Sequence, residues 1–96
     1  MSDIRLVTEG ERELRPLVEA ALANELRLIE AGIRQAERRL KEFEEKYHAS
    51  TEEFISGYER DERGESMEFA EWIGECRLME RRREKADTIR EIRFEN

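Results

Sequence analysis

Apolar residues recur at every third or fourth position between residues 22 and 47. They are Leu22, Leu26, Ile29, Ile33, Ala36, Leu40, Phe43 and Tyr47, separated by 4, 3, 4, 3, 4, 3 and 4 residues. This spacing is the a/d pattern of a left-handed coiled coil. Nearly every other position in the stretch is charged, so the apolar stripe is narrow and the remaining faces are solvated. We predict one long helix whose stripe, the core seam, packs against a partner helix.

The start of this helix depends on Pro16. Thr8 and Glu11 form a T-x-x-E capping-box pattern, which would start the helix directly after Thr8. Pro16 would then lie in the helix interior, where it removes a hydrogen bond and costs about 3 kcal/mol. A start at residues 13–15 places Pro16 in the first turn, where its missing N–H is harmless. We predict the later start, with a kinked earlier turn as the alternative.

Two shorter segments complete the helical pattern. We expect the long helix to end at His48, in the left-handed conformation. Ser50, with Glu53 three residues later, forms a second capping-box pattern that opens a short helix. After a charged loop, Ser66 caps a third helix. Its apolar residues at helical spacing are Phe69, Trp72, Ile73, Cys76, Met79, Ala86 and Ile89.

The predicted fold is all-α, an antiparallel hairpin of long helices with a short connecting helix. We expect helices at about 14–47, 51–60 and 67–90 in a hairpin domain of residues 13–93. We expect residues 1–12 to form an N-terminal arm and residues 94–96 to form a C-terminal tail. The sequence leaves open whether each segment is a strand, a helix or disordered. Small residues such as Ala20, Ala21, Ala31 and Gly32 lie on or beside the stripe, where they would let another helix approach closely.

The composition suits long helices in one small domain. Of 96 residues, 45% are charged and 38% hydrophobic, a balance typical of helices covered with ion pairs. A hairpin with so narrow a stripe buries little surface and is marginal alone. We therefore predict a homodimer, parallel or antiparallel, in which Ile29, Ile33, Leu40 and Phe43 are buried against the third helix and a second copy.

The net charge of −7 is concentrated in residues 52–75, which hold nine acidic and two basic residues. An acidic surface attracts a basic partner and repels nucleic acid, although acidic surfaces also serve solubility alone. The single cysteine, Cys76, excludes an internal disulfide and is compatible with a reducing cytosol. We find no signal peptide and no apolar run near 18 residues, so we predict a cytoplasmic protein without a membrane span.

Catalytic and metal sites are not indicated. The only histidine, His48, lies 28 residues from Cys76, so no nucleophile and base are suggested. One histidine and one cysteine do not make a zinc site, and no glycine-rich phosphate loop is present. We predict no enzyme activity, no metal and no cofactor.

Residues 77–85 contain the only basic cluster, formed by Arg81, Arg82, Arg83 and Lys85. A nucleic-acid patch is one interpretation, with a small RNA-binding protein as its consequence. Glu80, Glu84 and Asp87 interleave with the basic residues at i,i+3 and i,i+4 spacing. We therefore favour a solvated face that is paired within its own helix.

Two runs carry a family resemblance. Residues 44–54 are E-E-K-Y-H-A-S-T-E-E-F, and residues 67–72 are M-E-F-A-E-W. They resemble a group of small archaeal and bacterial helical proteins with the pattern K-Y-G-M-S-x-E-E-F, a glycine loop and D-F-x-E-W. His48 and Ala49 stand where that pattern has Gly-Met. The resemblance implies the antitoxin half of a toxin–antitoxin pair, of the kind paired with TumE-like toxins.

An antitoxin binds its toxin directly, and the expected partner is a basic enzyme that handles nucleic acid. The residues we expect to bind it are Phe54, Tyr58, Glu62, Glu65, Glu68 and Trp72. Aromatic side chains are frequent interface anchors, but a tryptophan on so polar a chain is also a natural core residue. Both interpretations of Trp72 stay open, as does a structural or adaptor coiled coil as the alternative function.

Overall fold

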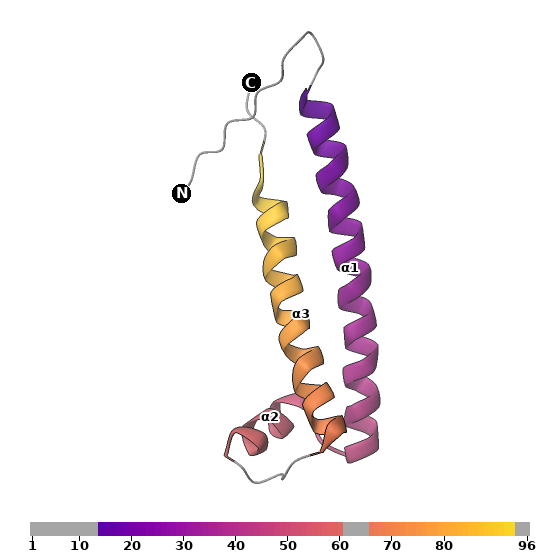
Figure 1. The fold of residues 1–96 in the computed structure, drawn as a ribbon, viewed down its shortest axis with the longest axis vertical. Coiled ribbons are helices and arrows are strands. Elements are labelled where there is room, and N and C mark those ends of the chain that lie inside the picture. The colour runs from indigo at the N-terminus through magenta and orange to yellow at the C-terminus, as the bar shows by residue number, and fades with distance from the viewer. Residues whose placement is uncertain (1–13, 61–65, 94–96) are drawn as a thin grey trace.

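The computed structural model describes residues 14–60 and 66–93. They form three helices, α1 (Leu14–Tyr47), α2 (Thr51–Glu59) and α3 (Met67–Glu91), with bounds at most one residue from the predicted ranges. Helices α1 and α3 run antiparallel side by side, and α2 lies across one end of the pair (Figure 1). The all-α hairpin is therefore confirmed. The predicted N-terminal arm and C-terminal tail lie outside the described residues.

Local sequence signals account for the helix ends. Pro16 is the third residue of α1, in the turn where no N–H bond is lost. His48 closes α1 with φ 51°, in the left-handed region expected of it. Ser50 Oγ accepts a hydrogen bond from the Glu53 backbone N–H at 3.1 Å, and Ser66 caps α3 in the same way. These two caps fix where α2 and α3 begin.

The core seam of α1 faces α3 of the same chain. Its buried members are Ile29, Ala36, Leu40 and Phe43, and its half-buried members are Leu22, Leu26, Ile33 and Tyr47. The residues that α3 buries are Trp72, Ile73, Cys76, Met79 and Ala86. The partner helix that the seam requires is thus supplied in cis. Burial of the half-exposed seam residues against a second copy stays a prediction.

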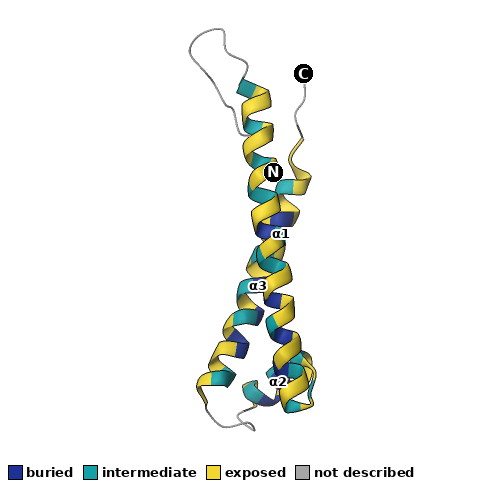
Figure 2. Cartoon of the chain, turned by 90° about the vertical axis from the view of Figure 1, so that its right-hand side faces the viewer, coloured by how far each residue is buried: buried dark blue, intermediate teal, exposed yellow. Residues whose placement is uncertain are grey.

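The core is uneven along the hairpin. Most buried residues cluster toward α2, from Ala36 to Leu40 and Phe43 on α1, whereas Ile29 and Ala86 lie toward the free end of the hairpin. Exposed positions dominate that free end (Figure 2). The burial that stabilises the fold is therefore concentrated at one end of the molecule.

Ion pairs bridge the two long helices along their length. On the α3 basic cluster, Arg83 pairs with Glu37 at 3.2 Å and Lys85 with Glu25 at 3.4 Å. The prediction that these two residues pair within α3 is therefore wrong, because α1 presents carboxylates at the matching heights. Such exposed pairs stabilise a fold by about 0–1 kcal/mol each, so they set the helix register more than the stability.

Gly32 makes room for an arginine of α3. Arg82 Nη1 donates a hydrogen bond to the Gly32 carbonyl at 3.1 Å. A Cβ at position 32 would lie 3.1 Å from both Cζ and Nε of Arg82, tighter than ordinary van der Waals contact. The absence of a side chain at Gly32 therefore leaves room for the guanidinium group of Arg82. Because this group hydrogen-bonds to α1, it is less accessible to a nucleic acid.

Candidate partner-binding site

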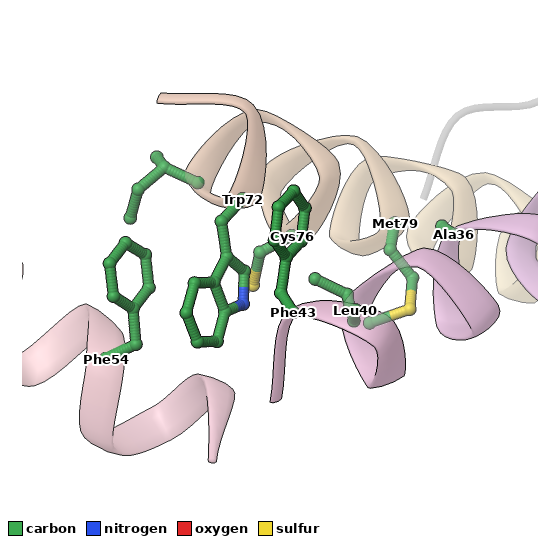
Figure 3. Packing of buried hydrophobic residues seen from close by; sticks show 8 residues of the cluster. Ala36, Leu40, Phe43, Phe54, Trp72, Cys76 and Met79 are labelled. Atoms are coloured by element: carbon green, nitrogen blue, oxygen red, sulfur yellow. The ribbon is translucent and has the colours of Figure 1, made fainter. Parts of the chain in front are cut away.

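An aromatic cluster joins the three helices at the α2 end. The indole of Trp72 lies between the rings of Phe54 and Phe43 (Figure 3). Ring centroids are 3.9 Å apart for Phe54 and Trp72 and 5.4 Å apart for Phe43 and Trp72, with interplanar angles of 4° and 13°. Trp72 Nε1 donates a hydrogen bond to Thr51 Oγ1 at 3.1 Å. The cluster thus fixes α2 to both long helices.

Two of the predicted partner-binding residues belong to this core. Phe54 and Trp72 are each 0% exposed, so neither side chain presents surface to a partner in the closed hairpin. Their stacked rings lie under α2, which the apolar pattern did not indicate. Tyr58 is half-buried and packs on Phe54 with ring centroids 5.7 Å apart. Tyr58 therefore keeps some surface that a partner can reach.

Glu68 is engaged within the chain. Lys46 Nζ donates to both of its carboxylate oxygens at 2.6 and 2.8 Å, and the Tyr47 hydroxyl donates to Oε2 at 2.6 Å. The ammonium group, followed by the phenol, lowers the pKa of Glu68. The same carboxylate raises the pKa of Tyr47, since its hydrogen bond holds the phenol proton. Glu62 and Glu65, the other predicted acidic contacts, lie outside the described residues.

The outer face of α2 carries exposed negative charge. Glu52, Glu53 and Glu59 are exposed and form no ion pair among the residues that the structure describes. Glu52 and Glu59 are seven residues apart, or two helical turns, and therefore share one face. This acidic face, defined by the three glutamates, points away from the hairpin core that Phe54 enters.

A groove of about 600 Å³ lies beside this acidic face, between α1, α2 and α3. Its lining includes the apolar residues Leu40, Ile55 and Met79, and its acidic residues are Glu37, Glu44, Glu52 and Glu80. Glu44 accepts a hydrogen bond from the Thr51 backbone N–H at 2.7 Å, and Glu37 pairs with Arg83. The groove is therefore apolar in part, and most of its charged lining residues are acidic. Sequence reasoning missed it, because three helices must meet before it exists.

Cys76 also lines the groove, but its thiol has low reactivity. Burial, followed by the nearby Glu80 carboxylate, raises the pKa of the Cys76 thiol. Its Sγ lies 3.9 Å from Glu80 Oε1, and a protonated thiol is a weak nucleophile. Within residues 14–60 and 66–93, no three His, Cys, Asp or Glu side chains are placed to hold a metal ion.

None of the described helices has the length and apolar content needed to cross a membrane. In comparisons with known proteins, no family model, curated protein or solved structure matches this chain.

Proposed function

We propose that this chain is a protein-binding module, the antitoxin of a toxin–antitoxin pair, which neutralises its toxin in the cytoplasm by direct binding. The observation that carries the proposal is the acidic face of α2, whose three glutamates lack ion pairs among the described residues. The sequence resemblance to antitoxins of TumE-like toxins supports the same function. The proposed partner is a basic enzyme that handles nucleic acid, because its phosphate-binding surface complements this face.

Binding at this end of the hairpin would use charge and apolar contact in different ways. The acidic face attracts the toxin and raises the association rate, whereas buried apolar contacts slow dissociation. Ile55 is half-buried and lines the groove, and Tyr58 is half-buried against Phe54. These two residues replace Phe54 and Trp72 as the proposed anchors.

Co-expression with the product of the neighbouring gene tests the proposal, scored by recovery of growth and by co-purification. Replacing Glu52, Glu53 and Glu59 together by Gln should slow association at least about tenfold and flatten its salt dependence. Tyr58→Ala should instead speed dissociation about 30-fold, since interface aromatics contribute about 2 kcal/mol or more. Glu45→Gln, an exposed change on α1, is the matched control and should leave both rates unchanged.

The proposal would be contradicted if the protein encoded by the neighbouring gene is not toxic. It would also be contradicted if both sets of substitutions leave the association and dissociation rates of that protein unchanged. The structural or adaptor function would then be favoured. The RNA-binding alternative is weakened by the contacts that Arg82, Arg83 and Lys85 make with α1.

A further inference from the structure

Helix α1 carries a second heptad stripe in addition to the core seam. It consists of Leu17, Ala21, Asn24, Leu28, Ala31 and Gln35, separated by 4, 3, 4, 3 and 4 residues. All six residues are exposed, and none is charged in a chain of which 45% is charged. We call this stripe the outer seam. Its spacing is that of a coiled-coil contact surface.

The outer seam points away from α3. Consecutive residues of a helix are about 100° apart, so Leu28 cannot face α3 together with its neighbour Ile29. Leu28 is 62% exposed and Leu17 is 68% exposed, whereas Ile29 is 6% exposed. The two leucines are eleven residues apart and lie within about 20° of each other around the helix. They therefore form one aligned apolar face.

Nothing among the described helices covers this face. Helix α2 is fixed to the aromatic cluster at the far end of the hairpin, and α3 packs on the core seam. We propose that the occupant is a second copy of this chain, whose α1 packs antiparallel on the outer seam to form a homodimer. The proposal is independent of the function proposed above.

One antiparallel register matches the outer seam to itself. In that register Leu17 lies opposite the partner's Leu28, and Ala21 lies opposite the partner's Asn24. The paired stretch runs from residue 14 to residue 31, inside α1 of both copies. Each exposed leucine then meets a leucine, and the alanines let the helix backbones approach closely. Shifting the register by a heptad toward the C-terminus would instead bring the two Arg27 side chains together across the interface.

The charge distribution also favours the antiparallel arrangement. The described parts of the acidic segment, residues 52–60 and 66–75, lie at the α2 end, remote from the outer seam. Parallel pairing would set two such segments side by side. In the antiparallel register α1 extends about 37 Å from the dimer centre to its C-terminal end, so the two acidic ends lie roughly 75 Å apart. That separation far exceeds the distance over which charges interact at physiological salt.

The free end of the hairpin is where self-association would help most. Only Ile29 and Ala86 are buried toward this end, among the residues that the structure describes. The cross-helix pairs there, Lys85 with Glu25 and Arg90 with Glu30, are exposed and contribute little. Covering Leu17 and Leu28 adds the apolar burial that this end lacks.

Sedimentation velocity of the full chain tests the proposal. At about 100 µM the mass of the wild type derived from its sedimentation should be twice the chain mass of 11.5 kDa. Leu28→Glu should raise the dimer dissociation constant by about 100-fold or more, because two leucine contacts are replaced by buried charge. Its helix content should be unchanged, because Leu28 is exposed in the single chain. Met67→Glu is the matched control, since Met67 is 91% exposed on α3 and should leave the dimer intact.

Cysteine cross-linking tests the orientation. Leu17→Cys chains mixed with tagged Leu28→Cys chains should form a mixed disulfide dimer on mild oxidation, and neither variant should cross-link well to itself. The native Cys76 is kept in both variants, because its buried thiol does not compete in the cross-linking reaction. A monomeric wild type would overturn the proposal, and so would a dimer that survives Leu28→Glu unchanged. Efficient cross-linking of Leu28→Cys to itself would overturn the antiparallel arrangement.

Discussion

Phe54→Ala tests whether the aromatic cluster holds α2 in place. Phe54 is the one large side chain that α2 buries, since Gly57 is its only other buried residue. Its ring stacks on Trp72 and also contacts Phe69 and Tyr58, with ring centroids 5.2 and 5.7 Å from its own. Truncation removes all three contacts and leaves a cavity at the point where the three helices meet.

The expected loss is about 3–5 kcal/mol of the free energy of unfolding. Burial of a phenylalanine contributes about 1.5–3 kcal/mol, and each aromatic pair adds about 0.5–1.5 kcal/mol. With three pairs the sum is about 3–7.5 kcal/mol, and its lower part is the range of about 3–5 kcal/mol typical of buried Phe→Ala changes. A domain of 96 residues has a total stability of about 5–14 kcal/mol. The substitution should therefore remove a large part of it, and α2 should detach before the hairpin opens.

The single tryptophan makes the detachment visible. Trp72 is 0% exposed, so its fluorescence maximum should shift to longer wavelength in Phe54→Ala at low urea, while far-UV circular dichroism keeps most of the α1 and α3 signal. Urea titration followed by both probes gives the loss of stability. Ser56→Ala, an exposed change on the same helix, is the control and should move neither probe. An unshifted fluorescence maximum together with an unchanged urea midpoint would refute the reasoning.

Three further predictions concern single groups. Because the pKa of Glu68 is lowered in the folded state, the stability it provides is complete above its ordinary pKa of 4.5 and is lost as the pH falls toward the folded value. Urea titrations of Glu68→Gln should therefore show a deficit at about pH 7 that shrinks at about pH 3. Cys76, buried with a raised thiol pKa, should react with an alkylating reagent at least about 100-fold more slowly than in the urea-unfolded chain; equal rates would mean that the core is open. Ile33→Asp should destabilise the hairpin by about 3 kcal/mol or more in urea titration, whereas Gln35→Asp, exposed two positions away, should cost less than about 1 kcal/mol.

The helices could be predicted because their signals are local. Pro16, Ser50 and Ser66 act on the backbone within one turn of themselves, so the sequence is enough to place them. The heptad spacing of the core seam likewise requires only that α1 be a helix with one apolar face. The structure gives these elements the predicted bounds because no tertiary contact opposes the local preferences.

The contacts between helices were harder to predict, because they depend on register. Arg83 has carboxylates at ion-pair spacing on its own helix as well as on α1. Its pairing with Glu37 follows from the way α3 packs against α1. The seat of Arg82 over Gly32 likewise joins residues 50 positions apart. The burial of Trp72 depends on packing in the same way, since it requires α2 to fold back over the indole. The residues that remain exposed for a partner follow from that packing.

The two proposals together predict the composition of a complex. The paired stretch of the outer seam, residues 14–31, lies toward the N-terminal end of α1. The acidic face of α2 lies at the opposite end of the hairpin, so one partner does not block the other. An antiparallel dimer presents two acidic faces roughly 75 Å apart, too far for a single small toxin to reach both. We therefore expect two toxin chains for each dimer, measured as the mass of the purified complex by light scattering. Leu28→Glu should give a one-to-one complex with unchanged affinity per site, because no avidity is lost when the two sites are independent. A complex with one toxin per dimer would show that the two sites are not independent.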